Sequence, residues 1–266
     1  MNSKKSLVSL HYYPIKGCKV IDCRRMKVNP MGPEMDRRWM IVDEKGRFIS
    51  QRQEPKMALI GTAIDQKGLT LRIPGEGEHR IAIFNEGPRK EVAIWDDVCL
   101  GIDQGDEIAE RLSRFLGREC RLVFMPDSTH RPINPKYAGP EAQVGFADRF
   151  SFLLISEASL EDLNSRLDRP VPMNRFRPNL VVSGCRPFEE DGWKRIRIGQ
   201  IHFSIAKPCS RCTVTTVDQS TAEKGDEPLK TLATYRKQEK GIMFGQNLVH
   251  LDQGFLSVGD SVEIIE

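Results

Sequence analysis

Residues 206–218 read Ala-Lys-Pro-Cys-Ser-Arg-Cys-Thr-Val-Thr-Thr-Val-Asp and set two thiols, Cys209 and Cys212, beside two cations, Lys207 and Arg211. Neighbouring positive charge favours the thiolate, which is the form of cysteine that binds metals and attacks electrophiles. The Thr-Val-Thr-Thr-Val run that follows has the composition of a β-strand, so we expect the chain to continue as a strand there. The stretch is therefore a candidate site on a β framework.

A C-x-x-C pair has three ordinary uses: half of a zinc site, a redox dithiol, or a soft ligand for one other metal. No second C-x-x-C pair occurs and the chain has only five histidines, which weakens the zinc interpretation. A thioredoxin-like dithiol lies between a strand and a helix, whereas a β-prone run follows this pair. On a regular strand the spacing points the two thiols to opposite faces, so only one of them looks into a site. Two buried, inert cysteines remain the simplest alternative.

The pair belongs to a series of short motifs that keep a fixed order along the chain: Tyr13–Lys16, Asp36–Trp39, Arg52–Pro55, Ser156–Leu160, Phe176–Gly184, Lys207–Val217, Glu227–Leu232, Phe244–Leu248 and Val258–Asp260. This series resembles the MOSC family, the molybdenum-cofactor sulfurase C-terminal domains. The resemblance is closest to the branch that contains the mitochondrial amidoxime-reducing component and its bacterial stand-alone relatives. Because the matches run from Leu7 to the last residue, they are far more specific than C-x-x-C alone.

Composition excludes several other classes of protein. The 266 residues are 39% hydrophobic and 29% charged, which is ordinary for a soluble protein with a packed core. A net charge of +3 implies no polybasic arm for a nucleic acid, and an anionic small ligand fits better. Seven cysteines, an odd number, do not suggest a secreted disulfide framework. No apolar run is long enough to span a membrane, so we expect a cytoplasmic protein that binds neither membranes nor nucleic acid polymers.

Short β-like runs separated by Gly- and Pro-containing turns dominate the first part of the chain, which is typical of a sandwich or barrel. They end at an amphipathic pattern over 106–117 that predicts a helix stopping at Gly117. The expected strands, including the two arms of a hairpin over 38–51, are Leu7–Tyr13, Arg38–Asp43, Phe48–Gln51, Ala58–Ile60, Leu69–Ile73, Arg80–Phe84 and Glu91–Trp95.

The second part of the chain begins with a long loop over 126–145, which is often a lid or rim. Helices are expected from Ser159 and over 228–237, the second beginning with proline. The expected strands are Phe152–Ile155, Asn179–Ser183, a hairpin over 195–205 and Ser261–Ile265. Together with the resemblance, these patterns predict a mixed, mainly β fold: a β-barrel-like MOSC N-terminal domain over 1–120 and a MOSC β-barrel domain with a few helices over 121–266.

The resemblance implies a site for the molybdenum cofactor, Mo-molybdopterin, with Cys212 as the catalytic residue and the metal ligand. The matching cofactor-binding positions are Lys16, Arg37, Asp148, Arg177, Asn179, Ser210, Arg211 and Cys212, and Cys209 becomes a packing thiol. On the residues alone, Lys16 could be a solvated surface lysine, Arg177 a structural arginine and Asp148 a turn residue.

Three positions depart from the animal members of the family. Gly17 stands where they have serine, Arg149 where they have threonine, and Asn247 where they have tyrosine. At position 17 one side-chain contact is lost unless a backbone N–H replaces it. Arg149 adds a cation and Asn247 removes an aromatic wall, and we expect these two changes to affect substrate preference more than cofactor binding.

The resemblance implies an oxidoreductase that reduces small N-hydroxylated compounds such as hydroxylaminopurines and amidoximes. Family members are also associated with pyridoxal phosphate binding and detoxification. The chain ends at Glu266 without the thiolate spacing of a ferredoxin, so we expect a separate electron donor: a ferredoxin, a flavodoxin or a cytochrome b5-like protein with its reductase. The alternative is a sulfur or molybdenum-cofactor carrier that uses Cys212. A structural β protein without a ligand is the third possibility.

Overall fold

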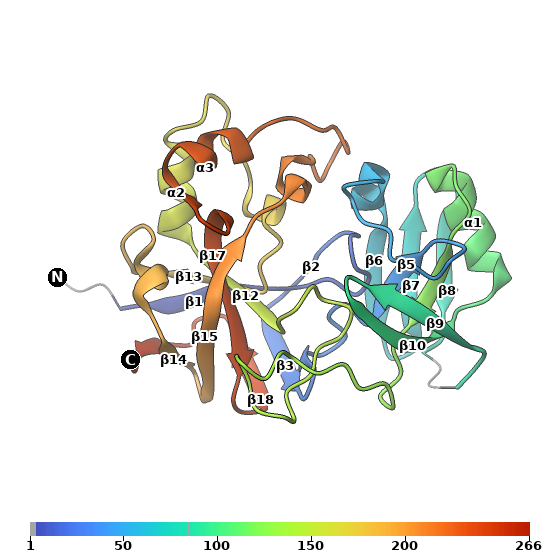
Figure 1. Ribbon diagram of the computed structural model, residues 1–266, viewed down its shortest axis with the longest axis horizontal. Coiled ribbons are helices and arrows are strands. Elements are labelled where there is room, and N and C mark those ends of the chain that lie inside the picture. Colours follow the sequence, from blue (N-terminus) through green and yellow to red (C-terminus); the bar gives the residue numbers. More distant parts are fainter. Residues whose placement is uncertain (1–3, 84–85) are drawn as a thin grey trace.

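The computed structural model describes residues 4–83 and 86–266 and is mainly β. Two β-rich halves lie side by side (Figure 1). We call the half with the nine-stranded sheet the large-sheet half and the other the small-sheet half. The first three residues of the predicted domain 1–120 and the end of the predicted strand Arg80–Phe84 lie outside the described ranges.

The largest sheet joins strands from both ends of the chain in the order β19-β14-β15-β17-β12-β13-β1-β2, with β16 paired to β17. The β12–β13 pair is parallel, and all the remaining strand pairs in this sheet are antiparallel. The strands are β1 (Ser6–Tyr12), β2 (Ile21–Cys23), β12 (Phe152–Ser156), β13 (Leu180–Ser183), β14 (Arg195–Ile198), β15 (Ile201–Ser210), β16 (Lys237–Gln238), β17 (Gly241–His250) and β19 (Val262–Ile264).

The first strands of the chain belong in space with its C-terminal part. Strand β1 pairs with β13, with Leu10 opposite Leu180. Strand β3 (Arg25–Asn29) pairs with β18 (Gly254–Ser257) and, on its other side, with the short β4 (Gly32–Pro33). The large-sheet half is therefore built from both ends of the sequence, while the predicted boundary between residues 120 and 121 stays a prediction.

Among the described residues, the small-sheet half contains one α-helix and two sheets, whose strand orders are β5-β11-β10-β9 and β6-β7-β8. Helix α1 (Asp106–Leu116) buries Ile108, Leu112 and Leu116 against the core of this half and ends at Gly117, as predicted. The strands are β5 (Trp39–Val42), β6 (Gly61–Asp65), β7 (Gly68–Ile73), β8 (Gly77–Ile81), β9 (Arg89–Ile94), β10 (Asp97–Asp103) and β11 (Arg121–Phe124).

Three local predictions need correction. The run Phe48–Gln51 is not a strand, since only Phe48 pairs with β5, through a single bridge to Val42. The run Ala58–Ile60 is not a strand, because Pro55 starts a 3₁₀ turn, η1 (Pro55–Leu59), with the backbone angle that a helical turn requires. Helix α2 (Glu157–Asn164) begins before Ser159, because the Ser156 side chain caps it by accepting from the Ser159 N–H. The helix predicted over 228–237 is present as α3 (Leu229–Tyr235), with Pro228 as its N-cap, but it ends before Lys237, which lies in β16. The remaining short 3₁₀ turns are η2 (Met173–Arg175), η3 (Glu189–Gly192) and η4 (Thr213–Thr216).

Candidate functional site

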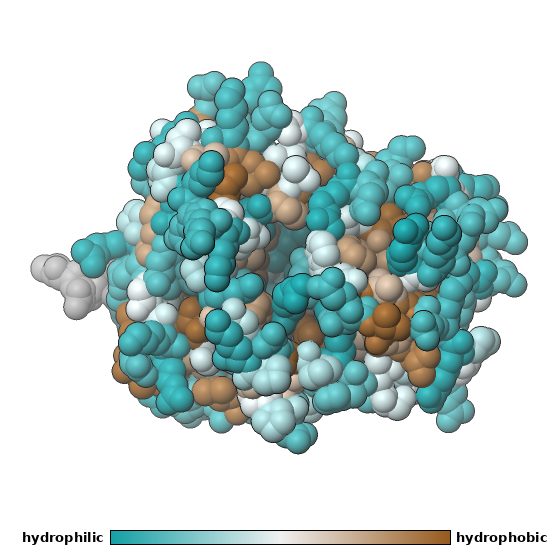
Figure 2. All heavy atoms as spheres, in the orientation of Figure 1, coloured by the Kyte–Doolittle hydropathy of each residue, from teal (hydrophilic) through white to brown (hydrophobic). Residues whose placement is uncertain are grey.

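A cleft lies between the two halves, and Figure 2 shows the hollow on this face of the molecule. The empty space between its walls is about 940 Å³, a volume that includes open solvent. Among the described residues that line it, one carboxylate, Asp148, faces six cationic side chains: Lys16, Arg37, Arg52, Arg149, Arg177 and Arg211. This excess of positive charge favours an anionic ligand.

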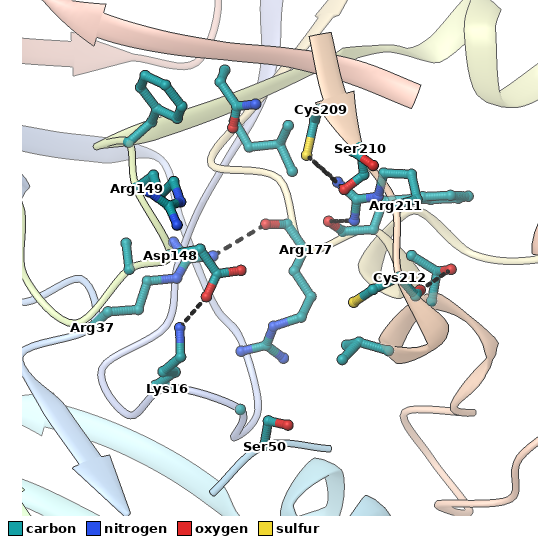
Figure 3. A pocket seen from close by; sticks show the side chains of 18 of the residues that line it. Lys16, Arg37, Ser50, Asp148, Arg149, Arg177, Cys209, Ser210, Arg211 and Cys212 are labelled. Carbon is teal, nitrogen blue, oxygen red and sulfur yellow. Dashed lines mark hydrogen bonds and ion pairs between the residues drawn. The ribbon is translucent and has the colours of Figure 1, made fainter. Parts of the chain in front are cut away.

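Lys16 and Asp148 form an ion pair on one wall of the cleft (Figure 3). The backbone N–H of Lys16 donates to the Trp39 carbonyl at 2.8 Å, which fixes the loop that carries the lysine. Burial lowers the pKa of Lys16, against the effect of the carboxylate. Desolvation by the surrounding cleft would raise the pKa of Asp148, but the Lys16 ammonium and hydrogen bonds from Lys16 and Trp95 hold that pKa well below its usual range. Asp148 is therefore an ionised acceptor at neutral pH.

Arg37 is held from several sides on the same wall. Its backbone has a left-handed φ of 48° and is bonded to the Tyr13 carbonyl and the Phe146 N–H at 2.8 and 2.7 Å. Its guanidinium donates to the Asp36 carboxylate and to Asn179 Oδ1. Burial would lower the pKa of Arg37, but the adjacent Asp36 outweighs burial and raises it. The charge of Arg37 is thus fixed in place before any ligand arrives.

Asn179 is buried and connects this wall to the large sheet. Its side-chain amide accepts from the Leu153 N–H at 3.2 Å, donates to the His11 carbonyl at 3.1 Å and accepts from Arg37 at 3.3 Å. Its side chain thereby joins β12, β1 and the cationic wall. The arrangement makes Asn179 a support for Arg37.

Arg177 differs from Arg37 because part of its guanidinium is unpaired. Its φ is 57°, and its guanidinium lies 4.2 Å from the centroid of the Tyr13 ring. Buried Nη2 has no hydrogen-bond partner among the described residues. Burial lowers the pKa of Arg177 to about 10, so the group still carries its charge at neutral pH. A buried, charged donor without a partner fits a ligand that supplies an acceptor.

Cys209 and Cys212 lie on the opposite wall, where β15 ends and η4 begins (Figure 3). Cys209 Sγ accepts from Arg211 Nη1 at 3.0 Å, and Arg211 Nη2 donates to the Phe176 carbonyl at 2.6 Å. Arg211 Nε is buried without a partner among the described residues. Cys212 precedes η4 and is exposed at the cleft. Ser210 donates to the Lys240 carbonyl at 3.3 Å and also lines the cleft.

The predicted strand after the thiols is wrong, because residues Thr213–Thr216 form the 3₁₀ turn η4. The hydroxyls of Thr215 and Thr216 donate back to the carbonyls of Cys212 and Thr213 at 3.0 and 2.9 Å. Such bonds from threonine to nearby backbone stabilise a turn against the strand that composition favours.

Two further expectations about this stretch also need correction. Cys209 does not turn away from the cleft, because the pairing of β15 with β17 shifts register twice and strand alternation is lost. Lys207, which was expected to act beside the thiols, is not one of the residues that line the cleft, and its ammonium lies 5.8 and 5.6 Å from the ring centroids of Tyr137 and Phe150. The cation that contacts a thiol is Arg211.

The structure brings every predicted site residue to this one cleft: Lys16, Arg37, Asp148, Arg177, Asn179, Ser210, Arg211 and Cys212. The three departures, Gly17, Arg149 and Asn247, line it as well. Sequence reasoning missed the contribution of the small-sheet half, whose lining residues are Phe48, Ser50, Gln51, Arg52 and Trp95. The signal for Arg52 was present, because it opens the Arg52–Pro55 motif.

Gln51 links the two halves beside the thiols. Its amide donates to the Gly17 carbonyl at 2.7 Å and exchanges two hydrogen bonds with the amide of Gln219 at 3.0 and 2.9 Å. Gln219 lies three residues after the end of η4. The pair therefore ties the turn that carries Cys212 to the loop that carries Lys16.

Within residues 4–83 and 86–266, no three His, Cys, Asp or Glu side chains gather as ligands for a metal ion. All seven cysteines of the sequence are free thiols. Over the same ranges, no helix combines the length and the apolar character needed to cross a membrane. Cys209 and Cys212 thus have no third protein ligand in this part of the chain.

Comparison with known proteins gives matches along nearly the whole chain. The model for the MOSC N-terminal beta barrel domain matches residues 4–119, and the model for the MOSC domain matches residues 141–263. Mitochondrial amidoxime-reducing component 1 is 34% identical in Mus musculus and 33% in Homo sapiens, covering 98% of this chain and 82% and 83% of those proteins. Molybdenum cofactor sulfurase from Homo sapiens is 30% identical, over 96% of this chain and 32% of that protein.

Proposed function

The chain belongs to the MOSC family, and from this premise we propose that it is a molybdenum-cofactor-dependent oxidoreductase that reduces N-hydroxylated compounds such as amidoximes and hydroxylaminopurines. One observation carries the proposal. An exposed thiol, Cys212, stands across a cleft from a wall of fixed cations. Mo-molybdopterin has the two matching parts, a metal that accepts a thiolate ligand and an anionic phosphate.

The residues present fit this cofactor, because two of the cleft's guanidiniums have buried N–H groups without partners, Arg177 Nη2 and Arg211 Nε. Cys212 would ligate the metal, and Ser210 and Arg211 would contact the cofactor beside it. Lys16, Arg37 and Arg177 would hold the phosphate. Asp148 and Asn179 would act mainly by fixing Lys16 and Arg37, to which they are already bonded.

The reaction converts R–NH–OH, two electrons and two protons into R–NH2 and water. The cofactor supplies the two-electron, oxygen-transfer chemistry when it is bound. The chain positions the substrate and sets the local field. Asp148 does not supply a proton at neutral pH, because Lys16 keeps it ionised. The open side of the cleft admits a small substrate and lets water leave.

The electrons would come from a separate protein, a ferredoxin, a flavodoxin or a cytochrome b5-like protein with its reductase. We also propose a cytoplasmic location, which the seven free thiols support. The division into a MOSC N-terminal domain over 1–120 and a MOSC domain over 121–266 is part of the same proposal, and the two family matches support it.

Expression in paired hosts tests the function. We expect protein from a host that makes the molybdenum cofactor to contain molybdenum and pterin and to reduce N-hydroxylated adenine with a chemical electron donor. Protein from a matched host that lacks cofactor synthesis should do neither. Apo protein without pterin fluorescence from the competent host would overturn the proposal.

A sulfur or cofactor carrier is the second candidate, and the exposure of Cys212 favours it, because a carrier must present its thiol to another protein. The similarity to molybdenum cofactor sulfurase adds support. Mass spectrometry after incubation with a cysteine desulfurase separates the two functions. Sulfur retained on Cys212, with no reduction of hydroxylamines by molybdenum-loaded protein, would favour the carrier.

A further inference from the structure

The tip of the β9–β10 hairpin is held against the mouth of the cleft. Ile94 pairs with Asp97, so the turn consists of Trp95 and Asp96. Trp95 has a φ of 56°, an unusual conformation for so bulky a residue, which needs support from its surroundings. The support comes from its indole N–H, which donates to Asp148 at 3.0 Å. The tip is thereby fixed across the cleft to a loop of the large-sheet half.

This tip gathers two arginines that are distant in sequence. The guanidinium of Arg52 lies 4.5 Å from the Trp95 ring centroid, and Arg149 donates to the Asp96 carboxylate at 3.2 Å. Both arginines line the cleft, and Figure 3 shows Arg149 beside Asp148. The hairpin tip therefore places two guanidiniums at one mouth.

The guanidiniums of Arg52 and Arg149 lack the close carboxylate partners that Lys16 and Arg37 have. Within the described residues, no acidic group forms an ion pair with Arg52. The Arg149–Asp96 pair is open to water, with 55% and 89% of the two side chains exposed, so it contributes little and can be exchanged for a stronger partner. The cofactor proposed above is served by other residues, so these two charges remain for a different anion.

On the basis of the proposed function, we infer that Arg52 and Arg149 form a subsite for a phosphate group of the substrate. Arginine binds phosphate through two parallel N–H bonds, and two arginines at one mouth suit a terminal phosphate. Trp95 and Phe150 also line the cleft and supply apolar ring surface to it. The substrate class is an N-hydroxylated nucleotide, preferred over its uncharged nucleoside.

Kinetics on the cofactor-loaded protein test this with the N-hydroxylated forms of adenine, adenosine and AMP. We expect kcat/KM for the AMP derivative to exceed that for the nucleoside by at least about tenfold, since charged hydrogen bonds contribute on this scale. Arg52→Gln and Arg149→Gln should each reduce this ratio by about tenfold, mainly through KM, and added salt should reduce it further. Lys136→Gln removes an equal charge from an exposed loop outside the cleft and should leave the ratio unchanged.

Molybdenum content separates the two possible sources of phosphate. If Arg149→Gln or Arg52→Gln lowers molybdenum occupancy, the arginine binds the phosphate of the cofactor and the inference is wrong. Equal kcat/KM for nucleoside and nucleotide in the wild-type protein would also overturn it.

Calorimetric titration with AMP and adenosine provides a readout that does not need turnover. The subsite is supported if AMP binds more tightly than adenosine and if Arg52→Gln and Arg149→Gln weaken the binding of AMP. This result would support it even in a protein without reductase activity. Loss of AMP binding in Arg177→Gln, with Arg52→Gln and Arg149→Gln unaffected, would place the phosphate in the deeper part of the cleft and contradict the inference.

Discussion

The two walls of the cleft differ in how far the protein satisfies its own polar groups. On the paired wall, which consists of Lys16, Asp148, Arg37 and Asn179, the side chains bond to one another or to nearby backbone. On the thiol turn, residues 209–212, Cys212 is exposed and Arg211 keeps one buried N–H unbonded. The first wall is preorganised, and the second is left open.

The difference shows which side chains are ordered before a ligand binds and which keep unbonded groups that a ligand can engage. Charges fixed in advance bind an anion without paying the cost of ordering side chains. An exposed thiol followed by a turn contributes little to folding and is available as a metal ligand. Substitutions on the paired wall should therefore affect stability, and substitutions on the thiol turn should affect chemistry.

The largest effect is expected for Cys212→Ser on the thiol turn. It should lower the rate of hydroxylamine reduction by more than about 100-fold, because removing a metal ligand lowers activity more than removing a residue that only supports a ligand. The free energy of unfolding should hardly change. Steady-state kinetics and urea unfolding measure the two quantities.

Cys209→Ala is the matched control for Cys212→Ser. Its sulfur contacts Arg211 and packs against the core around Phe176, so we expect a modest loss of stability and activity within about tenfold of wild type. Equal loss of activity in the two variants would contradict the distinction and would favour a centre that uses both sulfurs.

The next largest effect is expected for Asn179→Ala on the paired wall. This substitution leaves the Leu153 N–H, the His11 carbonyl and one Arg37 bond without their partner, which should cost about 2–4 kcal/mol of unfolding free energy. Ser210→Ala removes an exposed hydroxyl from the thiol turn and should change stability by less than about 0.5 kcal/mol. Urea denaturation measures the unfolding free energy of both variants. Similar losses of stability in the two would contradict the difference between the paired wall and the thiol turn.

The smallest effect is expected for Asp148→Asn and depends on pH. The folded-state pKa of Asp148 lies below its unfolded value of about 3.9, so its charge adds stability above that pH and this stability is lost on acidification. Because 66% of the side chain is exposed, solvent reduces the gain. The variant should melt slightly below wild type at pH 7, and the difference should begin to shrink as the pH falls below about 3.9 and continue to shrink down to the folded-state pKa. A difference that stays constant over this acidic range would show that the charge is not responsible.

Local sequence patterns predicted buried strands such as Phe152–Ile155 and Leu69–Ile73, because these have apolar or alternating residues. They did not predict β2, β3, β4, β6, β10, β11, β16, β17 or β18. Of these, β6 (Gly61–Asp65) and β10 (Asp97–Asp103) begin or end with Gly or Asp and are stabilised by their neighbours in the sheet. The η4 turn was missed because threonine side chains satisfy backbone carbonyls, an effect that composition alone does not reveal.

Ordered motifs predicted the site residues, yet their roles depend on tertiary contacts. Nothing in the segment around Asn179 indicates that its amide holds Arg37, a residue from a distant part of the chain. The place of Trp95 at the cleft depends on how the β9–β10 hairpin meets the loop that carries Asp148. Strand alternation failed at Cys209, because the register shifts of β15 follow from its pairing with β17.

X-ray absorption at the molybdenum edge tests the central claim most directly, because it counts sulfur ligands on the metal. We predict that loaded wild-type protein and Cys209→Ala give the same sulfur coordination, and that any molybdenum retained by Cys212→Ser has one sulfur ligand fewer. An unchanged spectrum in Cys212→Ser, or a sulfur ligand lost in Cys209→Ala, would contradict the assignment of Cys212 as the single protein ligand.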